Sequence, residues 1–420
     1  MPVTDALERP RVRRLRLYLI KPSKYDDDGY VIRHWKGVLP SNSLACLYGL
    51  SEDVRKRRVL GPDLQWEIEL IDETVERVDV EKIVRSGQGK ETKTVVCLVG
   101  VQSNQFPRAR DLALSFRQAG LDVLIGGFHV SGILATLSDL SPEIKLLRDH
   151  GVTLVAGEVE GRWEGILKDA LEGTLRPVYN FLASPPDLSA APMPQMAHGL
   201  LNRYAVRHFA TLDCGRGCPY QCSFCTVINV QGRRMRFRRV EDILDLVREN
   251  FRRHRIRHYF FTDDNFSRNK NWESIFEALA RLREEENIRV TFMMQVDTQS
   301  YRIPNFIEKA ARAGCSQVFI GVESLNEGNL KAAGKTQNST GRFKEMIEAY
   351  QEAGIVTHSA YIIGFPFDSP ESVRSDIHRL QTVLGTEQAS FFMLTPCSPR
   401  FPVRWTIGPF RTRKRFWITI

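Results

Sequence analysis

The sequence predicts an α/β protein built on two parallel sheets, and three observations support this. Two stretches, 15–183 and 204–396, alternate short apolar strands with amphipathic helices. Apolar residues make up 42% of the 420-residue chain and charged residues 26%, as in ordinary globular proteins. A chain of this length has room for two domains, each with its own core.

The first stretch is expected to form an open, doubly wound sheet, whose ligands bind beyond the carboxyl ends of the strands. Its glycine-rich sequence GGFHVSG, at 126–132, follows a strand and lets the backbone approach a ligand closely. The sequence is not GxGxxG, so it does not favour a nicotinamide cofactor. The expected strands are 15–22, 94–101, 121–127 and a short one near 153–157, and the expected helices are 108–120 and 160–173.

In the second stretch six strands alternate with five helices. This pattern predicts a parallel sheet with right-handed crossover connections, curved into a partial barrel. In such barrels the chemistry lies at the carboxyl ends of the strands. The six expected strands are 207–213, 258–264, 290–297, 317–324, 358–366 and 389–396, and the five expected helices are 240–251, 272–285, 303–314, 341–354 and 369–384.

The sequence predicts a cytoplasmic location without a transmembrane segment. It contains no apolar run of 18 residues, and its first residues lack the apolar region and cleavage site of a secretory signal. In the cytosol thiols stay reduced, so closely spaced cysteines indicate metal binding or redox work.

Four of the eight cysteines fall in CGRGCPYQCSFC, residues 214–225. Structural zinc normally uses two CxxC-like pairs separated by a dozen or more residues, and no second pair follows here. The spacing Cys218-x3-Cys222-x2-Cys225 instead supplies three thiolates, which can hold three irons of a [4Fe–4S] cluster and leave the fourth iron open. The remaining cysteines are expected to be inert thiols: Cys46, Cys97, Cys315 and Cys397.

This CxxxCxxC loop, with the aromatic Phe224 before its last cysteine, resembles the cluster loop of the radical S-adenosylmethionine (radical SAM) superfamily. The resemblance implies a partial (β/α)6 barrel with Cys218, Cys222 and Cys225 as catalytic metal ligands. It also implies that S-adenosylmethionine binds the open iron and is cleaved reductively to a 5′-deoxyadenosyl radical. Cys214 lies outside the pattern and is interpreted as a neighbour of the cluster, not a ligand.

The resemblance also implies cofactor contacts at the strand ends. Contacts with the methionine amino group are expected from the second strand, ribose contacts from the third, and adenine or ribose contacts from the fourth. The alternative for each residue is an ordinary strand-end cap. The residues are Asp263, Asp264 and Asn265, then Gln295 and Asp297, then Glu323, with Phe224 in the loop itself.

The order of the two halves resembles the cobalamin-binding subgroup of this superfamily, whose N-terminal domain is Rossmann-like. The resemblance implies that a GG-x-H stretch, a GE-x-E stretch and a preceding loop frame the corrinoid. The DxHxxG motif that supplies a cobalt ligand is absent, so His129 is expected to be a loop or nucleotide-tail contact. The alternative is a domain that has lost its ligand. The residues are Gly126, Gly127 and His129, Gly157, Glu158 and Glu160, and Gln102 and Ser103.

Four segments are predicted. A cobalamin-binding-type domain at 1–181 is followed by a Pro-, Ala- and Ser-rich linker at 182–203 and the barrel at 204–396. The last segment, 397–420, holds six Lys or Arg and no acidic residue, and is interpreted as an aberrant, out-of-frame tail.

The favoured function is a cobalamin-dependent radical methyltransferase that acts on an unactivated carbon of a small or lipid-like substrate. Its electron donor is expected to be an external flavodoxin or ferredoxin. The alternatives are a corrinoid-assisted cyclase or oxidoreductase without methyl transfer, a non-enzymatic corrinoid carrier or sensor, and a transfer RNA methylthiotransferase. The last requires three N-terminal cluster cysteines, but only Cys46 and Cys97 lie upstream.

The net charge of +9 does not indicate a nucleic-acid partner. The segment 397–420 contributes six of these charges, which leaves a modest +3 for the rest of the chain. Arginines just after the cluster loop, Arg233, Arg234 and Arg236, are instead candidates for facing carboxylates or phosphates of a cofactor.

Overall fold

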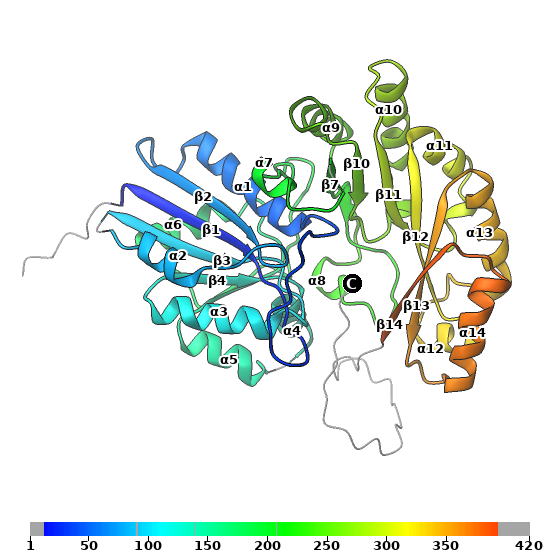
Figure 1. Ribbon diagram of the computed structural model, residues 1–420, viewed down its shortest axis with the longest axis horizontal. Coiled ribbons are helices and arrows are strands. Elements are labelled where there is room, and N and C mark those ends of the chain that lie inside the picture. Colours follow the sequence, from blue (N-terminus) through cyan, green and yellow to red (C-terminus); the bar gives the residue numbers. More distant parts are fainter. Residues whose placement is uncertain (1–11, 90, 138, 207, 394–420) are drawn as a thin grey trace, which may run out of the picture.

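The computed structural model describes residues 12–393 except 90, 138 and 207, and shows two α/β bodies side by side (Figure 1). The tail at 397–420, predicted to be aberrant, lies outside the described residues. Each body contains a six-stranded sheet, and a third sheet has two strands.

The N-terminal sheet has the strand order β2-β1-β3-β4-β5-β6, and every pairing in it is parallel. Because β1 has β2 on one side and β3 on the other, the sheet is wound in both directions, as predicted. The strands are β1 (Arg14–Lys21), β2 (Gln65–Asp72), β3 (Thr92–Leu98), β4 (Asp122–Gly126), β5 (Thr153–Ala156) and β6 (Val178–Asn180).

Helices cover both faces of this sheet, because successive strand residues point to opposite faces and both sets are apolar. Leu15, Leu17 and Leu19 belong to one core, while Tyr18 and Ile20 belong to the other. Helices α1 (Asn42–Arg57) and α6 (Trp163–Glu172) cover the first face. The second is covered by α2 (Val80–Ser86), α3 (Phe106–Gln118), α4 (Phe128–Thr136) and α5 (Pro142–Asp149).

The second sheet has the order β14-β13-β12-β11-β10-β7 with parallel pairings throughout. Its strands are adjacent in chain order, and β7 and β14 form its two edges within the described residues, so it is a partial barrel as predicted. The strands are β7 (Phe209–Leu212), β10 (His258–Phe261), β11 (Thr291–Val296), β12 (Cys315–Glu323), β13 (Val356–Ile363) and β14 (Gln388–Met393).

Helices pack on the outer side of this sheet, as Figure 1 shows. The five predicted ones are α9 (Val240–His254), α10 (Trp272–Glu284), α11 (Phe306–Ala313), α13 (Phe343–Glu352) and α14 (Pro370–Thr382). Shorter elements were not predicted: α7 (His198–Leu201), β8 (Gly215–Arg216), α8 (Val227–Val230), β9 (Arg236–Phe237), η1 (Phe266–Arg268), η2 (Ser300–Arg302), α12 (Glu327–Ala332) and η3 (Thr340–Arg342).

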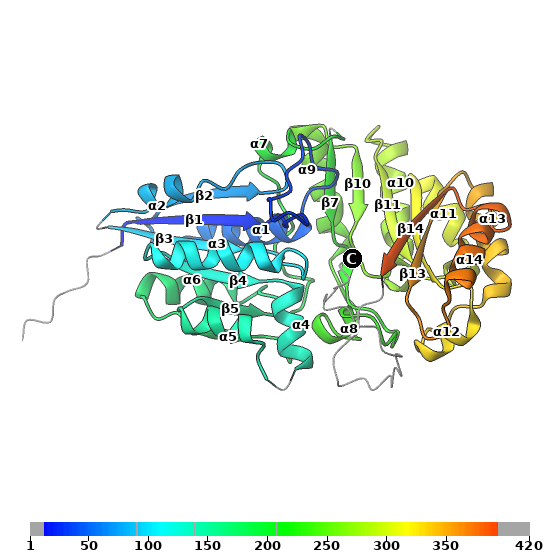
Figure 2. The ribbon, with the colours of Figure 1, turned by 60° about the horizontal axis from the view of Figure 1, so that its bottom comes forward.

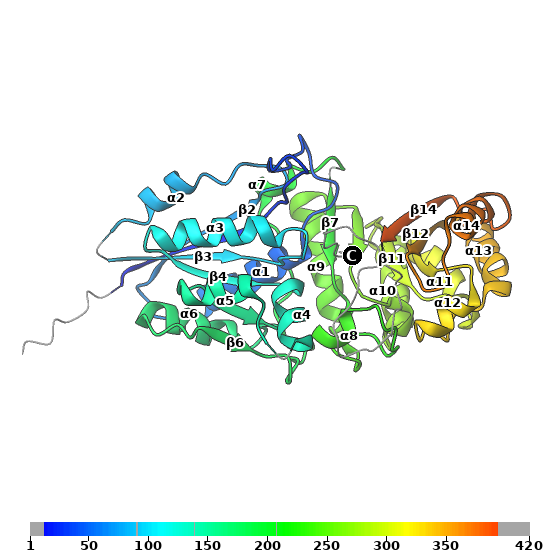
Figure 3. The same ribbon diagram turned by 90° about the horizontal axis from the view of Figure 1, so that it is seen from below.

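The two bodies meet where the strands of the N-terminal sheet end. Helix α4 contacts α8, and α1 contacts β7; Figures 2 and 3 both show α4 and α8 side by side. The segment predicted as a linker runs over this junction, where the Gln195 N–H donates to Ala45 O of α1 at 2.9 Å. A ligand site beyond the carboxyl ends of the N-terminal strands would therefore lie between the two sheets.

Several N-terminal elements differ from the sequence prediction. The glycine-rich stretch at 126–132 was expected to be a loop, but residues 128–136 form α4, whose apolar residues surround the helix and so give no helical period. Helices α1, α2 and α5 and strands β2 and β6 were also not predicted. Within the described part of the chain, none of the helices combines the length and apolar character needed to cross a bilayer.

Candidate active site at the junction of the two domains

The three cysteines of the CxxxCxxC motif lie in a loop that the β8–β9 hairpin closes at its base. Gly215 pairs with Phe237 and Arg216 with Arg236, so the chain leaves this hairpin just before Cys218 and returns to it after α8. Within the loop, the Cys225 N–H donates to Cys222 O at 3.1 Å. The motif is therefore a compact turn presented between the two sheets.

The donor set fits an iron–sulfur cluster better than a single metal ion. No three His, Cys, Asp or Glu side chains among the described residues are grouped tightly enough to hold one ion. In a [4Fe–4S] cluster each cysteine binds a different iron, which requires wider spacing. Burial raises the pKa of the Cys218 thiol and raises that of Cys225 to about 12, so metal binding would have to displace their protons.

Asp263 and Asp264 lie at the end of β10, as predicted, and both hold the backbone that leads into the cysteine loop. Asp263 Oδ2 accepts from the Cys214 N–H at 2.8 Å, and Asp264 Oδ2 accepts from the Gly217 N–H at 3.0 Å. Burial raises the pKa of Asp264 to about 6, although the Gly217 N–H and nearby arginines oppose this. These contacts make both carboxylates supports of the loop.

The ends of β10 and β11 are joined by hydrogen bonds between predicted site residues. Asn265 Nδ2 donates to Asp297 Oδ2 at 2.9 Å, and Gln295 Nε2 donates to Asp263 O at 3.1 Å. Arg268 also binds both oxygens of Asp297, at 2.6 and 2.7 Å. The structure thus brings the predicted polar residues of these two strands together at one edge of the barrel.

Glu323 ends β12 with φ +66°, a left-handed conformation that is uncommon for residues other than glycine. Its carboxylate forms a buried ion pair with Lys335, whose Nζ lies 5.8 Å from the ring centre of Phe224. A Cβ on Gly321 would lie 2.7 Å from that Nζ, so the Lys335 side chain would have to shift to admit one. The backbone strain at Glu323 is therefore tied to the placement of a cation beside the cysteine loop.

The segment 333–338, sequence AGKTQN, is a part of the site that sequence reasoning missed. Ala333 O accepts from the Ser223 N–H at 2.9 Å, and Gln337 Nε2 approaches Cys222 Sγ at 3.7 Å. Gln337 Oε1 is buried without a hydrogen-bond partner among the described residues. This unpaired acceptor beside a cluster cysteine fits a bound cofactor that donates to it.

A cavity of about 210 Å³ lies where β3, β4 and β5 end, between α1 and the barrel. Arg216, Val230 and Gln231 of the barrel contribute to its wall, so both domains enclose it. Asn42 Oδ1, also in the wall, is buried without a partner among the described residues. The cavity is smaller than the 300–1,000 Å³ typical of small-molecule sites, so it can enclose only part of a large cofactor.

Five predicted corrinoid residues line this cavity: Gly126, Gly127, Gly157, Glu158 and Glu160. Gly127 has φ +138°, and a Cβ there would lie 2.2 Å from Val101 N, so no side chain fits. Gly157 is held by its N–H, which donates to Ser131 Oγ at 3.0 Å. Asn42 and Cys46 of α1 also line the cavity, but no local motif marks them.

The other predicted residues of this domain, Gln102, Ser103 and His129, do not line the cavity. His129 is 7% exposed, its Nδ1 is 3.1 Å from Ser103 Oγ, and its ring stacks on Phe106 at 4.0 Å. The Gln102 N–H donates to Gln105 Oε1 at 3.0 Å. A direct cofactor contact by His129, Ser103 or Gln102 stays a prediction.

His129 gives a pH prediction. Burial lowers its pKa from 6.5 to about 4, so below pH 6.5 the unfolded chain binds a proton that the folded chain resists. The fold should therefore lose stability as pH falls from 6.5 to 4, by up to roughly 3 kcal/mol from this residue. Urea unfolding at pH 7 and pH 4.5 measures the loss, which should be smaller in His129→Phe. An equal loss of stability between pH 7 and pH 4.5 in the unaltered chain and in His129→Phe would contradict the contribution of His129 to the pH dependence.

Glu158 and Glu160, predicted to frame the corrinoid, are engaged by arginines of the barrel. Glu158 contacts Arg216 at 2.8 Å and Arg236 at 2.5 Å, and Glu160 contacts Arg216 at 2.7 Å. Burial raises the pKa of Asp213, but Arg216 and Arg238 outweigh this and hold it at about 2. Arg236 therefore does face a carboxylate, but one that belongs to the protein.

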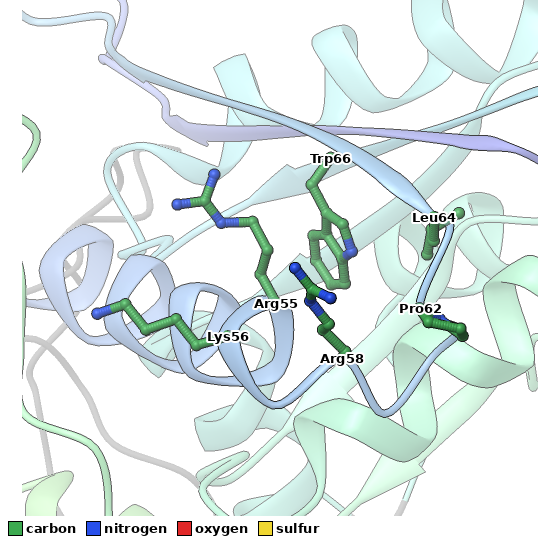
Figure 4. A pocket seen from close by; sticks show the side chains of 7 residues that line it. Arg55, Lys56, Arg58, Pro62, Leu64 and Trp66 are labelled. Atoms are coloured by element: carbon green, nitrogen blue, oxygen red, sulfur yellow. The ribbon is translucent and has the colours of Figure 1, made fainter.

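A separate hollow of about 400 Å³ lies at the other end of α1 and is lined by basic residues and Trp66 (Figure 4). Arg55, Lys56 and Arg58 belong to the carboxyl end of that helix, where cations are favoured by the unpaired carbonyls. The 16 residues of α1 separate this hollow from Asn42 by roughly 20 Å. It is not part of the site at the junction.

Comparisons with known proteins concern both the sequence and the fold of the chain. Residues 212–380 match the radical SAM superfamily. The chain is 30% identical over 264 residues to a bacteriochlorophyllide d C-12(1)-methyltransferase of Chlorobaculum tepidum, covering 61% of this chain and 54% of that protein. It is 28% identical over 193 residues to a hopanoid C-2 methylase of Rhodopseudomonas palustris, covering 44% and 35%.

Solved structures share the fold across both domains. The methyltransferase TsrM from Kitasatospora setae, with cobalamin and a [4Fe–4S] cluster bound, superposes with a TM-score of 0.66 at 17% identity, covering 92% of this chain and 76% of that one. The cobalamin-dependent radical enzyme OxsB gives 0.64 at 18% identity, covering 90% and 53%.

The chain spans only 54% and 61% of two bacteriochlorophyllide methyltransferases that it matches. The match to the radical SAM superfamily covers residues 212–380, which include the cysteine loop and most of the barrel that presents it. Across both domains the chain shares its fold with TsrM and OxsB.

Proposed function

We propose that this protein is a cobalamin-dependent radical SAM methyltransferase that acts on an unactivated carbon of a small or lipid-like molecule. The observation that carries the proposal is that the cysteine loop and the cavity meet at one junction, where Arg216 contributes to the cavity wall two residues before Cys218. Relatives with named methyltransferase activity support the same reading.

In this proposal Cys218, Cys222 and Cys225 hold a [4Fe–4S] cluster with S-adenosylmethionine at its open iron. The cluster supplies the electron that cleaves S-adenosylmethionine, and the corrinoid carries the methyl group. Lys335 places a positive charge beside the loop, and Gln337 offers an unpaired acceptor there. Asp263 and Asp264 fix the backbone before Cys218, which limits the movement of the loop.

The cavity is proposed to take part of the corrinoid. Its glycines let that group approach the backbone at the ends of β4 and β5, and Asn42 Oδ1 can accept from one of the cofactor's amides. The wall contains no histidine among the described residues, so we assign no protein ligand to cobalt.

The alternatives receive less support. A carrier or sensor has no use for three cluster cysteines. A methylthiotransferase requires more cysteines upstream than Cys46 and Cys97. A corrinoid-assisted cyclase or oxidoreductase uses the same site and differs only in whether methyl reaches the product.

A reducing cytoplasmic setting and an external flavodoxin or ferredoxin complete the proposal. The cysteines of the described residues are free thiols, as cluster assembly requires. The relatives suggest that the substrate search begin with tetrapyrroles and hopanoids.

The test is anaerobic reconstitution with iron, sulfide and hydroxocobalamin, followed by ultraviolet–visible and electron paramagnetic resonance spectra with and without S-adenosylmethionine. We expect about four irons and one corrinoid per chain, a cluster signal that shifts with S-adenosylmethionine, and transfer of labelled methyl to a product. A cluster without corrinoid would reduce the protein to a plain radical enzyme. Product without labelled methyl would favour the cyclase or oxidoreductase.

A further inference from the structure

Six charged side chains form a buried network between the cavity and the cysteine loop, here called the junction network. Three are acidic and three are arginines, so their charges balance. Each side chain is at most 11% exposed. The members are Asp213, Glu158, Glu160, Arg216, Arg236 and Arg238.

The acidic members come from both domains. Glu158 and Glu160 lie in the turn after β5 of the N-terminal sheet, and Asp213 directly follows β7 of the barrel. Arg216 joins all three: it contacts Asp213 at 2.9 Å, Glu158 at 2.8 Å and Glu160 at 2.7 Å. One guanidinium therefore ties the cavity-lining turn to the barrel.

The arginines come from the hairpin that carries the cysteine loop. Arg216 lies in β8, two residues before Cys218, and is paired in register with Arg236 of β9. Arg238 adds contacts of its Nη1 with Ala191 O at 3.3 Å and Pro192 O at 3.2 Å in the segment that joins the domains. Both arms of the hairpin are thus anchored at the junction.

Arg216 also reaches the first helix. Its Nη2 lies 3.4 Å from Cys46 Sγ, and Asn42 Nδ2 donates to Asp213 Oδ1 at 3.0 Å. Cys46, Asn42, Glu158, Glu160 and Arg216 all line the cavity. Three members of the junction network, Glu158, Glu160 and Arg216, therefore form part of the cavity wall.

A buried network of charged pairs fixes the relative position of the two domains better than apolar packing does. A buried charge without a partner costs several kcal/mol, so movement of one domain against the other is opposed wherever it breaks these pairs. The planar guanidinium binds its carboxylates in fixed directions, which a lysine ammonium cannot reproduce. The geometry is thus restrained in orientation as well as in distance.

We propose that Arg216 is a positioning residue that sets the distance and orientation between the corrinoid cavity and the cysteine loop. This rests on the proposed function. Two cofactors that act on one substrate need alignment to within about an ångström, because small displacements cost large factors in rate. Without Arg216, S-adenosylmethionine cleavage continues while methyl transfer fails.

The test compares Arg216→Met with the charge-balanced double variant Arg216→Met/Glu160→Gln. The double variant removes Arg216 and the charge of Glu160, which within the described residues forms its ion pair with Arg216, and so guards against simple misfolding of the single variant. The matched control is Arg57→Met, which removes an exposed Arg–Glu pair of 2.9 Å between α1 and α6 within one domain.

In both Arg216 variants, iron and corrinoid contents should stay near those of the unaltered chain. Three other readouts are expected to change together. The amount of 5′-deoxyadenosine formed per methylated product should rise at least about tenfold, equivalent to 1.4 kcal/mol, and both hydrogen exchange at 157–161 and proteolysis within 182–203 should accelerate. Arg57→Met should change none of these.

Unchanged coupling in the double variant would overturn the proposal, and so would loss of iron, which would make Arg216 a support of the loop alone. Failure of the proposed function is distinguishable, because the unaltered chain would then bind no corrinoid or transfer no methyl. In that case hydrogen exchange and proteolysis still decide whether Arg216 holds the domains together, and unchanged rates would overturn that role.

Discussion

Replacing Cys218, Cys222 and Cys225 together with alanine is expected to reduce bound iron from about four per chain to less than about one after anaerobic reconstitution. Formation of 5′-deoxyadenosine should fall to background, because reductive cleavage requires the cluster. The triple replacement removes every cysteine of the CxxxCxxC motif. Iron analysis and product chromatography measure both effects.

Cys214→Ala is the matched control for this experiment. Cys214 lies four residues before Cys218 but is fully buried in the core of the barrel. The iron content of the Cys214→Ala variant and its rate of S-adenosylmethionine cleavage should stay within about twofold of the unaltered chain, because the backbone N–H of residue 214 still donates to Asp263. Loss of iron in this variant would contradict our assignment of the ligands.

Ser43→Trp is expected to lower corrinoid binding at least about tenfold, equivalent to 1.4 kcal/mol. Ser43 is exposed at the edge of the cavity, so an indole can occupy the space without displacing core residues. Absorbance of the chain after removal of free hydroxocobalamin reports the bound corrinoid.

Ser43→Ala should bind corrinoid normally and serves as the control for loss of the hydroxyl. Ser43→Trp should also retain its iron, because the cysteine loop lies on the barrel side of the junction. Full corrinoid binding by Ser43→Trp would place the corrinoid elsewhere, whereas simultaneous loss of iron would indicate a general disturbance of the fold.

The barrel was predictable because its helices and strands have clear apolar periods. The six strands and five helices appear in the predicted order, and strand topology alone places Asp263, Gln295 and Glu323 at one edge. The cavity was predictable only in part. Gly126, Gly127 and Gly157 stand out because glycine permits close approach of the backbone, and all three line it.

The other residues of the junction could not be predicted, because they meet through contacts between distant parts of the chain. Arg216 meets Glu158 across 58 positions, and Asn42 meets Asp213 across 171, so no local pattern pairs them. Lys335 follows a short helix that has no long apolar period, and its importance appears only through Glu323 and Phe224. The prediction that Cys46 is an inert thiol was made because the sequence does not show that α1 borders the cavity.

The parallel arrangement of the sheets also has an electrostatic consequence. In a parallel sheet each helix begins on the side where the preceding strand ends, so α1 and α4 begin near the junction, at Asn42 and Phe128. Each amino terminus of a full-length helix carries about half a positive charge from its unpaired N–H groups. The backbone therefore contributes a positive potential at the junction that no side-chain substitution removes, and this favours anionic groups between the two domains.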